Sequence, residues 1–259
     1  MSVEYLPVAP TDQDKSFPAL APVEIDEYLP DAVPHSLAVL STVYHYNHWI
    51  FDQVREYLGP SVVEVGSGVG NITQFLLNAD RLACLEPFEP FRQYLRQRFA
   101  KHLNVGVFRH GIELCPNADV PAEQFDSVVC LNVLEHIPDD LHALECMRRL
   151  LRDGGLAIVV APAMPCIFGR MDAAMGHLRR YTLRSLRRTF QAAGLKPVKG
   201  KYMNVAGVLG WWWRGCLRKR PTLSASATRT FDRLVPILSA IERLIPAMVG
   251  QSVVMVGRA

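Results

Sequence analysis

The chain has 259 residues and a formal net charge of +3, and 49% of its residues are hydrophobic. This length predicts one large domain with additions. The longest apolar run, residues 202–213, is shorter than the roughly 20 residues that cross a bilayer, and the N-terminus lacks the basic and apolar regions of a secretory signal. The six cysteines form no CxxC pair, so we expect buried thiols and a reducing cytoplasm.

Charge is unevenly distributed along the chain. Residues 1–34 carry seven acids, one base and six prolines, which predicts a flexible acidic leader before a domain that covers residues 35–259. Residues 173–231 contain thirteen bases and no acid. This basic stretch is either a solvated face or a surface that favours an anionic acceptor.

The domain begins with an apolar helical pattern between Ser36 and Leu58, which predicts an N-terminal helical cap. Short apolar runs then alternate with helical stretches, as is typical of a doubly wound α/β fold with a parallel sheet. The predicted strands cover residues 61–65, 82–86, 104–108, 126–131, 155–161, 198–205 and 252–256, and the predicted helices cover residues 70–78, 88–101, 139–151 and 182–193. A lid at about 162–181 and an insertion at about 207–247 complete the domain.

A glycine-rich turn follows the first predicted strand, in VVEVGSGVGNIT at residues 62–73. Gly66, Ser67 and Gly68 allow the backbone to approach a ligand closely and to donate its N–H groups. Asn71 stands where a dinucleotide fingerprint needs a small residue, so pyrophosphate binding is disfavoured. Glu86 ends the second strand, where a carboxylate can accept hydrogen bonds from both ribose hydroxyls.

Four sequence blocks occur in the order EVGSGVG, LEP, FDSVVCLNVLEHIPDD and LLRDGGLAIVVAP. Together they resemble the class I S-adenosylmethionine-dependent methyltransferases over about residues 60–162. The following GHLRRYTLRSL is similar to a segment of a bacterial subgroup in glycan, lipid and secondary-metabolite pathways. The resemblance implies a seven-stranded Rossmann-like sheet with an antiparallel last strand, and S-adenosyl-L-methionine as the cofactor.

The resemblance also implies a set of cofactor-binding residues. In this set the first strand and its turn hold the methionine end, the second strand holds the ribose, and the end of the fourth strand faces the reactive methyl group. The adenine position lacks the family's aspartate, so a backbone N–H is expected to bind adenine there. The set consists of Glu64, Gly66, Ser67, Gly68, Glu86, Pro87, Gly111, Ile112, Leu131 and Asn132.

Methyl transfer is an in-line displacement from a sulfonium, so the protein has to align the acceptor and remove its proton. His177 in the lid is the candidate base, because an imidazole accepts a proton near neutral pH. His136, in LEHIP, is either a second candidate base or a histidine that packs at a helix start. No metal is expected, because Asn132 stands where divalent-metal methyltransferases would need a carboxylate, which disfavours a site at His136, Asp139 and Asp140.

Two features of the later sequence concern the acceptor. Arg179, Arg180 and Tyr181 are assigned to the acceptor site, where Arg180 or Arg179 binds an anionic part of the acceptor. The alternative is that Arg180 and Tyr181 tie the lid to the sheet and that His177 is exposed. Residues 211–213 are three tryptophans that cannot share one helix face, so one ring is exposed or covers a pocket, and Trp211 is assigned to the acceptor site. An apolar line at helical spacing predicts a helix across the active-site mouth or, alternatively, one resting on an anionic membrane, and it consists of Phe231, Leu234, Leu238, Ile241 and Ile245.

The sequence therefore predicts an enzyme that methylates an oxygen or nitrogen of a small molecule, free or linked to a glycan, lipid or carrier. The alternatives are another displacement at the sulfonium, a non-catalytic cofactor-binding role, or a nicotinamide-dependent oxidoreductase. A nucleic acid substrate is not expected, because residues 132–135 do not form the Asn-Pro-Pro-aromatic motif and no aromatic residue lies between Cys130 and Ile137.

Overall fold

The computed structural model of the chain describes residues 39–212, 225–244 and 248–259. In these residues seven strands form one sheet in the order β3-β2-β1-β4-β5-β7-β6. Neighbouring strands from β1 to β5 are parallel, and β7 runs antiparallel to both β5 and β6. This confirms the predicted doubly wound sheet with an antiparallel last strand. The strands are β1 (Ser61–Val65), β2 (Arg81–Leu85), β3 (Val105–Phe108), β4 (Phe125–Leu131), β5 (Leu151–Pro162), β6 (Lys196–Met203) and β7 (Ser252–Arg258).

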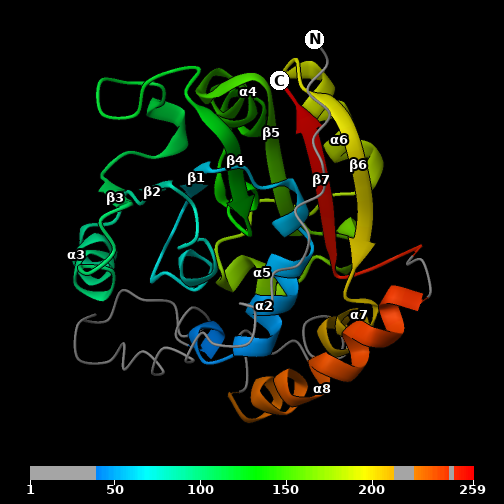
Figure 1. Cartoon of the computed structure of the whole chain (residues 1–259). Coiled ribbons are helices and arrows are strands. Elements are labelled where there is room, and N and C mark those ends of the chain that lie inside the picture. The colour runs from blue at the N-terminus through cyan, green and yellow to red at the C-terminus, as the bar shows by residue number, and fades with distance from the viewer. Residues whose placement is uncertain (1–38, 213–224, 245–247) are drawn as a thin grey trace.

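Helices cover both faces of the sheet (Figure 1). On β1, Val63 belongs to the core on the face of α4 (Asp140–Leu150) and α6 (Leu183–Ala192), whereas Val62 belongs to the core on the face of α2 (Tyr44–Asp52). This alternation follows from the two-residue period of a strand, and it explains why the central strands are apolar throughout. The helix α3 (Glu89–Arg98) connects β2 to β3.

The predicted helix over residues 70–78 is wrong, because the structure contains only one 3-10 turn there, Thr73–Phe75. Gly66, Gly68 and Gly70 all have positive φ angles, so the chain after β1 does not enter a helical path. A Cβ atom on Gly70 would lie 2.6 Å from the ring of Phe99, which keeps this turn pressed against the end of α3. The cofactor turn is therefore followed by a loop rather than by a regular helix.

The predicted N-terminal helix is interrupted. Its first part ends near Thr42, whose hydroxyl donates to the carbonyl of Val39, and α2 then begins at Tyr44. Asp232, from the C-terminal insertion, accepts the backbone N–H groups of Tyr46 at 2.8 Å and His45 at 3.4 Å. A carboxylate at this position satisfies the unpaired donors of a helix start, so a distant residue fixes where α2 begins.

The insertion contains α7 (Val205–Trp211) and α8 (Ala225–Leu244). Figure 1 shows α2, α7 and α8 gathered at one end of the sheet. Glu242 of α8 accepts the N–H groups of Asn204 and Val205 at 2.8 and 2.9 Å, as Asp232 does for α2. Two carboxylates of α8 thus hold its two neighbouring helices in place.

The predicted apolar line of α8 does not coincide with its buried side. Phe231 and Leu238 are half-buried, but Leu234 and Ile241 are exposed, and the buried positions include Asp232 and Val235. The polar contacts of Asp232 and Glu242 rotate the helix away from the orientation that hydrophobicity alone predicts. None of the described helices is long and apolar enough to cross a membrane.

Other sequence predictions differ in detail. The fifth strand begins at Leu151 rather than at residue 155, so the glycine pair 154–155 lies inside β5, where the pairing register with β4 shifts. The cysteines at 84, 115, 130 and 146 are buried free thiols as expected, whereas Cys166 is exposed. The predicted acidic leader at residues 1–34, the tryptophan at 213 and Ile245 lie outside the described residues.

Candidate active site

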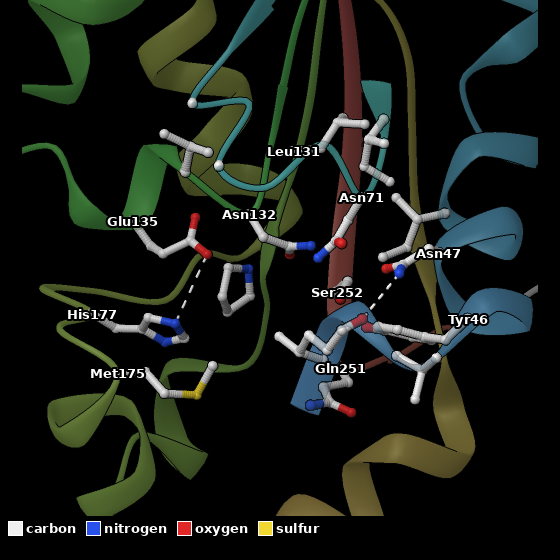
Figure 2. Close-up of a pocket in the computed structure, with 18 of the residues that line it drawn as sticks. Tyr46, Asn47, Asn71, Leu131, Asn132, Glu135, Met175, His177, Gln251 and Ser252 are labelled. Carbon is white, nitrogen blue, oxygen red and sulfur yellow. Dashed lines mark hydrogen bonds and ion pairs between the residues drawn. The ribbon is translucent and has the colours of Figure 1, made fainter. Parts of the chain in front are cut away.

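A cavity of about 450 Å³ lies at the carboxyl ends of β1 and β4. It is lined by the glycine turn, the end of β4, residues of α2, the lid helix α5 (Arg170–Ala174) and the loop that follows it, and by parts of α7 and α8. Figure 2 shows side chains from these separate segments converging on one space. Ligands of open α/β sheets bind at this edge, where the strand order reverses between β1 and β4.

The glycine turn is anchored to β2 by backbone hydrogen bonds. The N–H groups of Gly66 and Ser67 both donate to the carbonyl of Leu85, at 2.8 and 3.1 Å. A Cβ atom on Gly66 would lie 2.6 Å from a methyl group of Val133, so no larger residue fits between β1 and the end of β4. The turn therefore passes close to β4 and leaves the cavity open on its outer side.

Glu86 holds the same turn from the other side. Its carboxylate accepts the N–H of Gly68 at 2.8 Å and the N–H of Phe88 at 2.9 Å. Burial raises the pKa of Glu86, while the two backbone hydrogen bonds act in the opposite direction. Glu86 is thus positioned by the turn that it supports, beside the place where the resemblance puts the ribose.

Glu64 lines the cavity at the end of β1, and it is buried. The hydroxyl of Thr73 donates to its carboxylate at 2.6 Å. Burial raises the pKa of Glu64 to about 7, and the nearby charge of Glu86 adds to the increase. A carboxyl group with this pKa can become ionised when a cationic group, such as the ammonium of a methionine moiety, binds next to it.

The structure brings most of the predicted cofactor residues together. Those that line the cavity are Glu64, Gly66, Ser67, Gly68, Leu131 and Asn132. Four others, Glu86, Pro87, Gly111 and Ile112, are not among the described residues that line it. Asn132, at the end of β4, has a φ of +56°, which turns the chain sharply at the cavity wall.

Asp172 organises the lid from within the protein, where it is fully buried. Its carboxylate accepts hydrogen bonds from His177 Nδ1 at 2.9 Å, from Arg180 Nε at 2.7 Å and from Trp211 Nε1 at 3.2 Å. Burial opposes ionisation, but the hydrogen bond from His177 and the charge of Arg180 hold the pKa of Asp172 below its usual value. The lid is therefore fixed by a buried ionic network that the sequence analysis missed.

The three lid residues assigned to the acceptor have different positions. Arg180 lines the cavity, but it also donates to the carbonyl of Ala163 at 2.8 Å, and its guanidinium lies 4.6 Å from the centre of the Trp211 ring. Arg179 and Tyr181 both bind the Asp140 carboxylate, at 3.1 and 2.8 Å, and do not line the cavity. These contacts tie the lid to the sheet and to the start of α4, as the alternative predicted, but His177 is buried rather than exposed.

The two candidate bases lie side by side with a third residue that the sequence analysis missed. The rings of His136 and His177 are 5.0 Å apart, and Glu135 Oε1 lies 3.9 Å from His177 Nε2 (Figure 2). Glu135 is fully buried, and burial raises its pKa to about 8. In the sequence, Glu135 could have been noticed as an acid directly before His136 in an otherwise apolar segment.

The hydrogen-bond partners of this cluster are specific. His136 Nδ1 lies 3.1 Å from the carbonyl oxygen of Gly176, and burial and the nearby His177 lower the pKa of His136. Asp139 caps α4 by accepting the N–H of His142, and Asp140 is engaged by the lid, so neither acid joins His136 in the arrangement considered from the sequence. Tyr46, also missed, lines the cavity from α2, and burial raises its pKa.

The fold and this glycine turn define a Rossmann-like methyltransferase. A model of the methyltransferase domain family matches residues 41–199. The chain therefore belongs to this family, and the domain is an S-adenosylmethionine-dependent methyltransferase with S-adenosylmethionine as its cofactor.

Individual proteins are similar over different parts of the chain. Thiol S-methyltransferase TMT1A of Homo sapiens is 29% identical over 41% of this chain and 46% of its own length. The chloroplastic 2-methyl-6-phytyl-1,4-hydroquinone methyltransferase 1 of Oryza sativa subsp. japonica is 26% identical over 73% of this chain and 59% of its own length. The matches thus span about half the length of these curated relatives.

The structure of the CurJ carbon methyltransferase superposes with a TM-score of 0.55 at 16% identity, over 86% of this chain and 55% of that chain. At this identity the likeness shows the fold alone. It agrees with the sheet topology described above.

Proposed function

We propose that the protein transfers the methyl group of S-adenosylmethionine to an oxygen or nitrogen of a small-molecule acceptor that has a largely apolar body. One observation carries this proposal: the glycine turn and the cluster of Glu135, His136 and His177 open onto the same cavity. The sulfonium and the acceptor can therefore lie in one enclosed space, where alignment supplies much of the rate.

The walls of the cavity support an apolar acceptor. The apolar residues that line the cavity include Val43 just before α2, Ile50 of α2, Met171 and Met175 of the lid, and Phe231 of α8. Apolar surfaces of this kind bind hydrocarbon or aromatic groups through burial, and thioether side chains adapt to irregular shapes. A quinol, phenol or lipid-linked hydroxyl compound would fit this chemistry.

The cluster supplies a destination for the acceptor's proton. The Asp172 carboxylate accepts from His177 Nδ1, which leaves His177 Nε2 as the proton-accepting nitrogen in the neutral ring. Nε2 is directed toward Glu135 at the cavity edge. We therefore assign the general base to this cluster, with His177 as its proton acceptor and Asp172 as a positioning residue.

The preference for an anionic or carrier-linked acceptor stays a prediction. Arg180 lines the cavity, but Asp172 neutralises it, so the cavity wall has no unbalanced positive charge from this pair. Figure 1 places α6, which carries Arg184, Arg187 and Arg188, at the end of the sheet away from α7 and α8. Within the described residues, the bases on α6 therefore lie apart from α7 and α8.

Methyl transfer into a panel of acceptors tests the proposal. The panel contains matched apolar compounds that carry a hydroxyl, an amine or a thiol, together with phosphorylated hydroxyl compounds, and each reaction uses S-adenosylmethionine labelled in the methyl group. We expect a labelled O- or N-methyl product and an equal amount of S-adenosylhomocysteine. Methylthioadenosine as the product would instead indicate another displacement at the sulfonium, and cofactor binding with no turnover of any compound would favour the non-catalytic alternative.

A further inference from the structure

Glu135, His136 and His177 each bring one possible metal ligand atom to the same edge of the cavity. These atoms all lie within 4.8 Å of one another, and Glu135 Oε1 and His177 Nε2 are 3.9 Å apart. Two ligand atoms that each lie about 2.1 Å from one ion are roughly 3 to 4 Å apart. Shifts of about 1 Å in the positions of the three ligand atoms would therefore allow them to bind one ion.

The hydrogen bonds of the two imidazole rings determine which nitrogen atom is free. The carbonyl oxygen of Gly176 and the carboxylate of Asp172 can only accept, so His136 Nδ1 and His177 Nδ1 carry the hydrogens of these two contacts. In the neutral rings Nε2 then has the lone pair. A histidine ligand with its other nitrogen bonded to a carbonyl or a carboxylate is the usual arrangement at protein metal sites.

Glu135 completes the set in an unusual way. Both of its carboxylate oxygens are buried and accept no hydrogen bond within the described part of the chain. A buried carboxylate without a donor or a cation is energetically unfavourable. With Glu135 ionised, the cluster presents three electron-pair donors to one another, and a bound cation would satisfy all three.

We propose that Glu135, His136 and His177 bind a divalent first-row transition ion such as Zn²⁺. Two imidazole ligands favour Zn²⁺ over Mg²⁺ and Ca²⁺, which prefer sets of oxygen ligands. Three protein ligands leave at least one coordination position open toward the cavity, as in catalytic metal sites. Neither Asp139 nor Asp140 takes part, because both are bound elsewhere.

The role of this ion in the reaction rests on the proposed function. An acceptor hydroxyl bound at the open position would become more acidic and release its proton to solvent at the cavity mouth. Its oxygen would then attack the methyl carbon, so that an O–CH₃ bond forms as the CH₃–S bond breaks and S-adenosylhomocysteine leaves. In the metal-bound protein His177 is a ligand, and the ion takes over its part in removing the proton.

Calorimetric titration of untagged, chelator-treated protein with ZnCl₂, and separately with MgCl₂, tests the site. We expect one Zn²⁺ per chain and at least 10-fold weaker binding of Mg²⁺. Glu135→Gln, His136→Ala and His177→Ala should each weaken Zn²⁺ binding about 100-fold. His142→Ala is the matched control and should leave it unchanged, because His142 lies on α4, next to Cys146, and does not line the cavity.

Folding and function are measured separately in the same variants. Thermal unfolding and S-adenosylhomocysteine binding show whether each variant is intact. Asp172→Asn should weaken Zn²⁺ binding about 10-fold, because His177 loses the carboxylate that orients its ring. Zn²⁺ binding that survives in all three ligand variants, or is absent in the wild type, overturns the inference. Methyl transfer without Zn²⁺ binding would overturn the metal site and leave the proposed function standing. Zn²⁺ binding without methyl transfer to any compound would overturn the proposed function and leave the metal site standing.

Discussion

Asp172 Oδ1 lies 2.9 Å from His177 Nδ1, and both residues are buried. The same carboxylate oxygen accepts from Arg180 Nε at 2.7 Å. One acid thus sets the tautomer and orientation of the candidate base while it neutralises a buried guanidinium. This connection means that a substitution at Asp172 should affect stability and chemistry together.

Asp172→Asn should lower the free energy of unfolding by about 3 kcal/mol or more, because Arg180 would stay buried without its carboxylate partner. Urea denaturation followed by tryptophan fluorescence measures this change. Asp119→Asn is the matched control: its ion pair with His110 is 3.1 Å long but Asp119 is exposed, so we expect less than about 1 kcal/mol there. Equal losses in the two variants would contradict the importance of the buried network.

His177→Ala should reduce the turnover number by about 100-fold and leave the affinity for S-adenosylhomocysteine unchanged within about 2-fold. His177→Phe should behave in the same way, since neither residue can accept a proton or bind a metal ion. Steady-state kinetics and calorimetry measure the two effects. If turnover survives these changes but is abolished in His136→Ala, the essential imidazole belongs to the loop after β4.

Glu86→Ala should weaken S-adenosylhomocysteine binding by about 5 to 150-fold, which corresponds to about 1 to 3 kcal/mol. The lost ribose contact is one reason for the weaker binding, and the structure gives a second. Without the Glu86 carboxylate the Gly68 N–H loses its acceptor, and the glycine turn loses a contact that holds it in place. Glu89→Ala, at an exposed position on the first turn of α3, is the control and should bind like the wild type. Calorimetry that shows equal affinities for all three proteins would remove Glu86 from the cofactor site.

The raised pKa of Glu64, about 7 against an ordinary value of 4.5, predicts a pH dependence of stability. The folded protein keeps the Glu64 proton to higher pH than the unfolded chain does, so the free energy of unfolding should fall as the pH rises from about 4.5 to about 7. Glu64→Gln cannot ionise and should lack this part of the decline. Urea denaturation of both proteins at several pH values between 4.5 and 8 measures the difference.

The same group predicts the pH dependence of cofactor binding. S-adenosylhomocysteine carries a cationic ammonium group, which pairs with ionised Glu64, so affinity should increase from pH 6 to pH 8 in the wild type. The Glu64→Gln variant should bind more weakly and without this increase. A wild-type affinity that is flat across this range would show that Glu64 does not contact the ammonium group.

The exposed apolar residues of α8 are the ones that we expect to contact a membrane, if the protein binds one peripherally. Leu234, Ile237 and Ile241 are 48%, 61% and 52% exposed and recur at helical spacing, with Arg233 beside them. An apolar stripe beside a positive charge is typical of a helix that rests on an anionic bilayer. Replacing Ile237 and Ile241 with Asp should abolish co-sedimentation with vesicles that contain phosphatidylserine.

Leu103→Asp is the matched control for this experiment, because Leu103 is fully exposed and lies in the segment after α3 rather than on α8. It should sediment like the wild type. Retention of vesicle binding in the α8 variant, or equal loss in the control, would contradict membrane contact through α8.

Local sequence patterns were sufficient to predict the sheet and the cofactor turn. Each central strand is an apolar run, which is typical of a strand buried on both faces. Gly66 and Gly68 have positive φ angles, which other residues rarely adopt, so the sequence alone predicted the turn. The prediction that a helix follows this turn was wrong because the packing of Gly70 against Phe99, rather than local propensity, decides the path of the chain.

The way in which the lid and the insertion form the site depends on tertiary packing. Asp172 and Trp211 are 39 positions apart, Tyr46 and Asp232 are 186 apart, and His136 and Gly176 are 40 apart, yet each pair shares a hydrogen bond. Such contacts depend on how the elements pack, and no periodicity in the sequence encodes them. For the same reason the buried side of α8 follows the acids that cap α2 and α7, and the burial of the Glu135 carboxylate without a hydrogen-bond donor among the described residues cannot be predicted from the sequence.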